Sequence, residues 1–164
     1  MGNPRFGRMI PAMVTPMKDN LDLDLDRAQE LADRLVKGGA DSLIINGTTG
    51  ESPTVFYPDK IELFKAVVAA VDGRIPVIAN VGDNCTADTV GFASDVAKLG
   101  VDGFKTDGGE FLFGSNIRLA DGTPGGEAHN RYPMQYVKAY HRWMKETGVE
   151  GVTFSRAGYT GAQT

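Results

Sequence analysis

The feature that most constrains this chain is a regular alternation of short apolar segments with longer amphipathic ones. Four segments carry apolar residues at helical spacing, and short runs rich in Val, Ile and Phe lie between them. The expected strands are 8–15, 42–46, 75–80, 101–106 and 151–155, and the expected helices are 26–36, 59–71, 86–99 and 133–147. Apolar strands that alternate with helices are typical of a parallel sheet with right-handed crossovers. The sequence therefore predicts an α/β fold.

The length of the chain limits how such a sheet can close. A closed barrel of eight βα units needs roughly 200–250 residues, whereas this chain has 164. Two arrangements of a single α/β domain over residues 1–164 stay open: an open, doubly wound, flavodoxin-like sheet, or a partial TIM barrel of five strands completed by dimerisation. Unclosed barrel strands would leave apolar surface exposed around Val77 and Ile78. We therefore expect a homo-oligomer, most simply a twofold homodimer.

Composition argues against several classes of partner. The net charge is −4 without a Lys/Arg cluster, which disfavours a nucleic-acid or anionic membrane surface. No apolar run reaches the length of a membrane-spanning helix. The single cysteine, Cys85, cannot form an internal disulfide, so we expect a cytoplasmic protein. Neither histidine has a partner at metal-ligand spacing, and we expect no metal and no cofactor.

The turn Gly47-Thr-Thr-Gly-Glu51 follows the second expected strand and is a candidate binding site. The hydroxyl groups of Thr48 and Thr49, together with neighbouring backbone N–H groups, could hold a small carboxylate. An ordinary capped turn is the alternative, because Thr and Gly are common in turns.

A second set of candidates follows the fourth and fifth expected strands. Asp107 could act as a nucleophile or general base, and Arg156 could bind a hydroxyl-rich or anionic ligand. The alternative is that both are solvated loop residues, or that Asp107 pairs with Lys105 or Arg156. The long loop at 108–130 lies where ligands bind in parallel α/β folds, at the carboxyl ends of strands.

Segments 11–16, 47–52 and 73–80 carry a resemblance to a known family. Residues from about 9 to 99 resemble the dihydrodipicolinate synthase and N-acetylneuraminate lyase superfamily of class I aldolases. The resemblance implies the first three βα units of that TIM barrel, in which Thr48 matches a hydroxyl-relay threonine and Thr49 the threonine that holds the pyruvate carboxylate. The family's Schiff-base lysine and its tyrosine on the fifth strand have no match here.

Segments 102–110, 130–133 and 152–163 are similar to a different family, the family-31 retaining α-glycosidases. The resemblance covers about 101–164 and implies that Asp107 matches the catalytic nucleophile and Arg156 an arginine that contacts the sugar. The segment that holds this family's acid/base aspartate has no match in the sequence.

The two resemblances together predict a chimera, with aldolase-type units over 1–100, a glycosidase-type segment over 101–164 and a joint near 98–103. The expected function is that of a recombined or engineered partial-barrel scaffold without a complete native active site. Two alternatives remain: a weak α-glycosidase or sugar binder that uses Asp107, and a pyruvate or keto-acid binder or lyase at Thr48 and Thr49. If the chain is an enzyme, we expect a glycoside hydrolase before a lyase.

Overall fold

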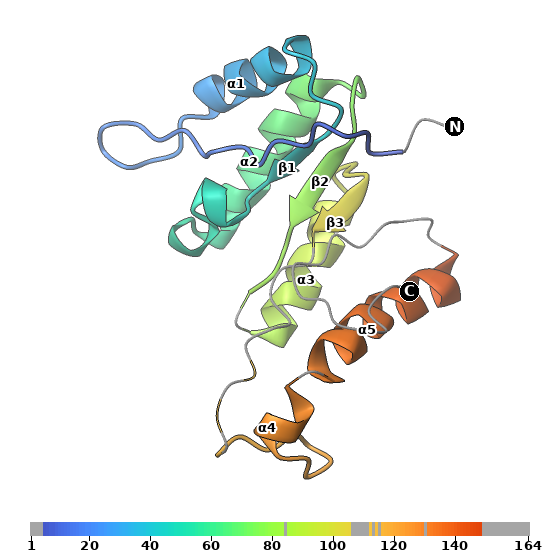
Figure 1. Cartoon of the computed structure of the whole chain (residues 1–164). Helices are drawn as coiled ribbons and strands as arrows, with labels where there is room; N and C mark the ends of the chain where they lie inside the picture. Colours follow the sequence, from blue (N-terminus) through green and yellow to red (C-terminus); the bar gives the residue numbers. More distant parts are fainter. Residues whose placement is uncertain are drawn as a thin grey trace. The chain divides into compact units, whose positions relative to one another are not determined.

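The computed structural model describes residues 5–83, 85–105, 112, 114, 116–129 and 131–148 (Figure 1). The chain divides into two compact units, Met1–Lys105 and Thr106–Thr164. Its elements in chain order are α1 (Leu25–Lys37), β1 (Leu43–Ile45), the 3-10 turns η1 (Thr48–Gly50) and η2 (Ser52–Thr54), α2 (Tyr57–Val71), β2 (Val77–Asn80), α3 (Thr86–Ala97), β3 (Gly103–Lys105), α4 (Gly125–Ala128) and α5 (Arg131–Thr147). The four expected helices are confirmed, with bounds that differ by at most two residues at either end.

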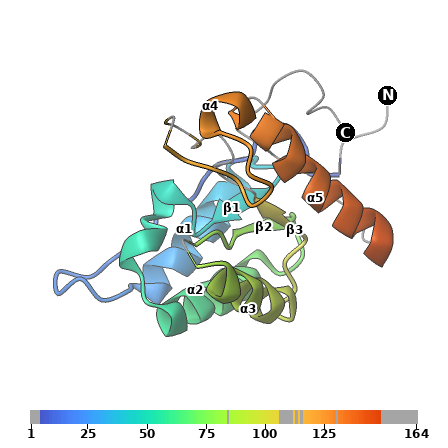
Figure 2. The ribbon, with the colours of Figure 1, turned by 90° about the horizontal axis from the view of Figure 1, so that it is seen from below.

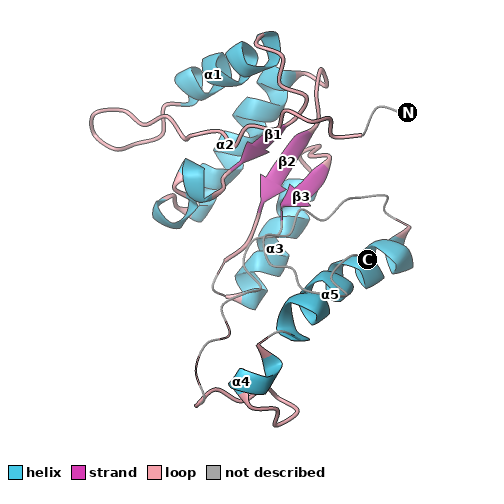
Figure 3. Ribbon diagram, in the orientation of Figure 1, coloured by secondary structure: helices cyan, strands magenta, loops and turns pink. Residues whose placement is uncertain are grey.

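The first unit is built on a three-stranded parallel sheet in the order β1-β2-β3 (Figure 3). Ile44 lies opposite Ile78, and Ile78 lies opposite Gly103. A flavodoxin-like sheet would place the earliest strand between the next two, whereas here the strands follow one another in chain order as they do in a barrel wall. The described strands therefore do not have the flavodoxin-like order, and the parallel sheet with its helices is consistent with a partial-barrel α/β fold.

The physical reason for this winding is that the three helices bury their apolar sides against one face of the sheet. Figure 2 shows α1, α2 and α3 along the same side of the strands. One core cluster joins the helices to that face; its fully buried members include Ala32, Leu43, Ile45, Leu63, Phe64, Val67, Ala79 and Val96. A doubly wound fold needs helices on both faces, and the described helices of this unit supply only one layer.

The opposite face of the sheet is covered by the segment that precedes the strands. Phe6, Ile44 and Ile78 form a second buried cluster, against which Ile10 packs. Gly103 makes room for this cover, because a Cβ there would lie 3.0 Å from Cζ of Phe6. The expectation of exposed apolar surface near Ile78 is wrong: Ile78 is 9% exposed beneath this cover, and its neighbour Val77, 2% exposed, packs in the core cluster on the helix side.

The first expected strand, 8–15, is reduced to a single parallel bridge between Ala12 and Ile44. Ile44 N donates to Pro11 O at 3.0 Å, and Met13 N donates to Ile44 O at 2.9 Å. Pro11 has no N–H group to donate and Pro16 follows closely, so the ladder cannot extend. The fifth expected strand, 151–155, lies outside the described residues.

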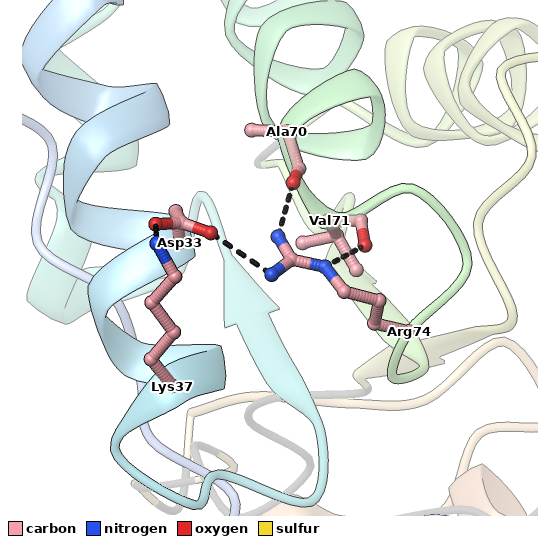
Figure 4. A network of polar contacts seen from close by, with 5 residues as sticks. All are labelled: Asp33, Lys37, Ala70, Val71 and Arg74. Atoms are coloured by element: carbon pink, nitrogen blue, oxygen red, sulfur yellow. Dashed lines mark hydrogen bonds and ion pairs between the residues drawn. The ribbon is translucent and has the colours of Figure 1, made fainter.

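A charged network fastens α1 to the end of α2 (Figure 4). Asp33 on α1 contacts Lys37 Nζ at 2.6 Å and Arg74 Nη1 at 2.9 Å. Arg74 also donates from Nη2 to Ala70 O at 2.6 Å and from Nε to Val71 O at 2.9 Å. Hydrogen bonds from Lys37 and then from Arg74 lower the pKa of Asp33. Arg74 thus caps carbonyl groups that the last turn of α2 cannot satisfy itself.

The second unit contains a small hairpin-like turn, the short helix α4 and the longer helix α5. Arg118 and Pro124 form an antiparallel bridge around a turn in which Gly122 N donates to Leu119 O at 2.9 Å. Part of the long loop expected over 108–130 is therefore ordered structure. Across the part of the chain that the structure describes, no helix is long and apolar enough to cross a membrane.

Candidate carboxylate-binding site

The apolar rows of the sheet give way to polar residues at the carboxyl ends of the strands. Asn46 directly follows β1, Asn80 ends β2 and Lys105 ends β3. Asn80 lies opposite Lys105 in the register, and the register of β1 with β2 brings Asn46 beside Asn80. Because side chains alternate between the faces of a strand, this row continues the face that carries Ile44 and Ile78. In parallel α/β folds, ligands bind at this end of the strands.

Asn46 and Asn80 hold each other through reciprocal hydrogen bonds. Asn46 Nδ2 donates to Asn80 O at 2.9 Å, and Asn80 Nδ2 donates to Asn46 O at 3.0 Å. Both residues are buried, at 1% and 6% exposure. Their Oδ1 atoms are also buried, and neither accepts a hydrogen bond from any described residue. Two buried acceptors thus lack the donors that buried polar groups ordinarily have.

The candidate turn begins directly after this pair. Asn46 adopts a left-handed conformation with φ 59°, which turns the chain out of β1. Within the turn, Gly50 N donates to Gly47 O at 2.9 Å and Glu51 N donates to Thr48 O at 3.0 Å. The first N–H groups of a helical turn have no acceptor within it. The N–H groups of Thr48 and Thr49 are therefore left outside the turn's own hydrogen bonds.

A buried contact fixes the turn against the segment that precedes α1. Thr15 Oγ1 donates to Gly50 O at 2.6 Å. A Cβ on residue 50 would lie 2.9 Å from Thr15 Oγ1 and 3.1 Å from Met13 O, so only glycine fits without a shift. Glu51 follows with φ 55°, a second left-handed residue. The position of the N–H groups is thus set by tertiary contact as well as by local sequence.

The sequence-predicted candidates divide between described and undescribed parts of the chain. Thr48 and Thr49 lie exposed in η1 at the carboxyl end of β1, which is where the pattern places them. Asp107 and Arg156 lie outside the described residues. Nowhere in the described ranges do three His, Cys, Asp or Glu side chains gather as metal ligands would.

Sequence reasoning missed the buried pair Asn46 and Asn80. The sequence does contain a signal for them, because each is an asparagine at the end of an otherwise apolar strand. A polar side chain that is buried at such a position needs a hydrogen-bond partner. Only the strand register shows that the two residues meet.

Comparison with known proteins places this chain in a family. Residues 5–106 match the family model for the dihydrodipicolinate synthetase family. The chain belongs to the dihydrodipicolinate synthetase family. The 4-hydroxy-tetrahydrodipicolinate synthase of Bifidobacterium animalis subsp. lactis is 53% identical over 97 residues, which cover 59% of this chain and 31% of that protein.

Solved structures agree with this family. Dihydrodipicolinate synthase from Bacillus anthracis superposes with a TM-score of 0.68 at 27% identity, over 90% of this chain and 45% of that chain. A dihydrodipicolinate synthase described as the first monomeric variant superposes with a TM-score of 0.66 at 28% identity, over 91% of this chain and 44% of that one. The chain thus spans about a third of the length of its curated relatives and less than half of these structures.

A second family model also matches part of the chain. The glycosyl hydrolases family 31 TIM-barrel domain matches residues 79–164 and so overlaps the first match over residues 79–106. The overlap contains the last two residues of β2 and all of α3 and β3. Both family models therefore match the same strand–helix–strand segment in the middle of this chain.

Proposed function

We propose that this chain binds short 2-oxo carboxylates such as pyruvate, with the carboxylate held by the turn Gly47–Glu51. The single observation that carries the proposal is the geometry of this turn. The N–H groups of Thr48 and Thr49 stand at the start of η1 outside its own hydrogen bonds, beside two exposed threonine hydroxyls. N–H groups at the start of a helical turn favour negative charge.

Charge in the same row supports an anionic ligand. Lys105 is in register with Asn80, at the same end of the sheet as the turn. Positive charge at this end of the sheet favours a carboxylate over a neutral ligand through Coulomb attraction. Membership of the dihydrodipicolinate synthetase family supports the same ligand class, since the resemblance assigns Thr49 to the pyruvate carboxylate.

The experiment is calorimetric titration with pyruvate and with its neutral amide, pyruvamide. We expect saturable binding of pyruvate with a Kd on the order of a millimolar and much weaker binding of pyruvamide, because the amide lacks the charge that the turn stabilises. Equal affinity for both compounds would contradict the proposal. Borohydride treatment with pyruvate tests lyase chemistry separately, through a covalent lysine adduct.

A second candidate function is sugar binding by the later part of the chain. The match of residues 79–164 to the family-31 glycosidase domain favours it, and it assigns Asp107 as nucleophile and Arg156 as the sugar contact. The same match supports a chimeric origin, with a joint near 98–103. Turnover of an activated aryl α-glycoside that is lost in Asp107→Asn supports this function; equal rates in both proteins count against it.

Self-association is the remaining part of the proposal. Among the described strands β3 lies at an edge of the sheet, and an edge strand offers unpaired N–H and C=O groups to a second copy. The relative described as the first monomeric variant of its kind supports association as the common state of that family. Light scattering over a concentration series decides between a dimer and a monomer of 17.6 kDa.

A further inference from the structure

We propose that Lys105 is a second anchor of the carboxylate site, and that the site takes 2-oxo acids that carry two carboxylates. The carboxylate next to the 2-oxo group binds the turn Gly47–Glu51, and the distal one binds the Lys105 ammonium group. This inference rests on the proposed function, because it takes the first carboxylate position as given. It deepens that function by naming dicarboxylic 2-oxo acids as the ligand class.

The first step is the face of the sheet on which Lys105 lies. Its neighbour Phe104 packs against the core cluster on the helix side. On the opposite side, Gly103 approaches the Phe6 ring, where a Cβ would lie 3.0 Å from Cζ. Successive residues of a strand alternate between the two faces. Lys105 therefore shares the face of Gly103, away from the helices.

The second step is the distance between the two anchors. Lys105 lies opposite Asn80, and Asn80 lies beside Asn46, from which the turn begins. Two strand spacings, roughly 10 Å, thus separate the backbone of Lys105 from the start of the turn. The carboxylate carbons of an extended five-carbon dicarboxylic acid are roughly 5 Å apart. The flexible four-carbon stem of lysine covers the remaining distance.

The third step is the charge at this end of the sheet. Lys105 is partly buried, whereas the acids that follow the first two strands, Glu51 and Asp83, are exposed. Asp83 Oδ1 also accepts a hydrogen bond from Cys85 N at 3.3 Å. Water and salt screen exposed charges more strongly than partly buried ones. The charge of Lys105 therefore favours a ligand whose far end is a carboxylate over one whose far end is neutral.

The test compares two acids of equal chain length on the unaltered protein, by calorimetric titration at constant pH. 2-Oxoglutarate carries a carboxylate where 2-oxopentanoate carries a methyl group, and the two are otherwise the same. We expect 2-oxoglutarate to bind at least about tenfold more tightly, the scale of a charge-assisted hydrogen bond. This preference should shrink as ionic strength rises, because salt screens the attraction to Lys105.

Variants then locate the second carboxylate. Lys105→Met removes the charge and should bring 2-oxoglutarate to the affinity of 2-oxopentanoate, whereas Lys105→Arg should keep the preference. Lys98→Met is the matched control and should leave the preference unchanged, because Lys98 caps the end of α3 and pairs with Asp95 at 2.9 Å. If Lys105→Met does not fold, the two acids and their salt dependence on the unaltered protein still decide.

The contradicting outcomes are distinct. Saturable binding of both acids with equal affinity would overturn the second anchor and leave the turn as the site; this is the result expected if Asp107 keeps Lys105 paired. A preference for 2-oxoglutarate that persists in Lys105→Met would overturn the role of Lys105. Failure of both acids and of pyruvate to bind would overturn the proposed function itself.

Discussion

Asn46 and Asn80 each donate a side-chain N–H to the backbone carbonyl of the other, at 2.9 and 3.0 Å, across the carboxyl ends of β1 and β2. Ile45 and Ala79 are the last register partners of β1 and β2. The two side-chain hydrogen bonds extend the pairing of these strands by one residue beyond them. The asparagine pair therefore serves two roles: it joins the strand ends, and it fixes where the turn Gly47–Glu51 begins.

The first prediction concerns the stability that this pair supplies. Asn46→Ala and Asn80→Ala should each lower the free energy of unfolding by about 1–3 kcal/mol, since each leaves a buried carbonyl without its donor. The double variant should lose less than the sum, because the residues share one network. Urea unfolding measures this, with Val90→Ala, on an exposed position of α3, as the control. Strict additivity of the two losses would contradict the coupling.

The second prediction concerns Gly50. Gly50→Ala should destabilise the chain and weaken pyruvate binding together, because a Cβ would meet Thr15 Oγ1 at 2.9 Å and Met13 O at 3.1 Å. Gly91→Ala is the matched control: a Cβ on that helical glycine of α3 meets nothing within 4 Å, and alanine should stabilise the helix by about 0.5–1 kcal/mol. If Gly50→Ala bound pyruvate with unchanged affinity, the turn would not be the binding element.

The third prediction concerns acid sensitivity at the start of the chain. Asp41 accepts hydrogen bonds from the N–H groups of Met9 and Arg8, both at 2.8 Å, and these bonds lower its pKa. A lowered carboxyl pKa contributes stability that is present above the ordinary pKa and is lost as pH falls through the lowered one. Urea midpoints should therefore fall in acid more steeply for the unaltered protein than for Asp41→Asn. Asp19→Asn, in an exposed turn, serves as the control, and parallel pH profiles for all three proteins would count against the assignment.

The fourth prediction concerns the contact between α2 and α3. Tyr57 donates its hydroxyl proton to Asp95 Oδ2 at 2.9 Å, and this hydrogen bond, followed by desolvation, raises the pKa of Tyr57. The stability from a raised pKa is present below the ordinary value and is lost as pH rises through the raised one. An NMR titration of the Tyr57 ring should show a lower pKa in Asp95→Asn and a smaller decrease in Asp88→Asn, because Asp88 acts only through charge. Equal decreases of the Tyr57 pKa in both variants would show that the hydrogen bond is not the main cause of the raised pKa.

The sequence predicts the helices and the central strands well because their apolar periodicity is strong and local. The position of Thr48 and Thr49 at a strand end also follows from order along the chain. The order of the strands does not follow from the sequence, since a flavodoxin-like sheet and a partial barrel have the same apolar periodicity. The structure shows the strand order and places the helices on one face. The cover that Phe6 provides, and the meeting of Asn46 with Asn80, depend on contacts between residues more than thirty positions apart. No local pattern contains that information.

The measurement that tests the central claim most directly is an NMR titration of the nitrogen-15-labelled chain with pyruvate. The account predicts saturable shifts at the backbone amides of residues 47–51 and at the side-chain amides of Asn46 and Asn80, while the exposed side of α1 stays unchanged. Sodium chloride at matched ionic strength should not reproduce these shifts. Saturable binding that leaves the amides of residues 47–51 unmoved, or no binding above the salt control, would contradict the proposed site.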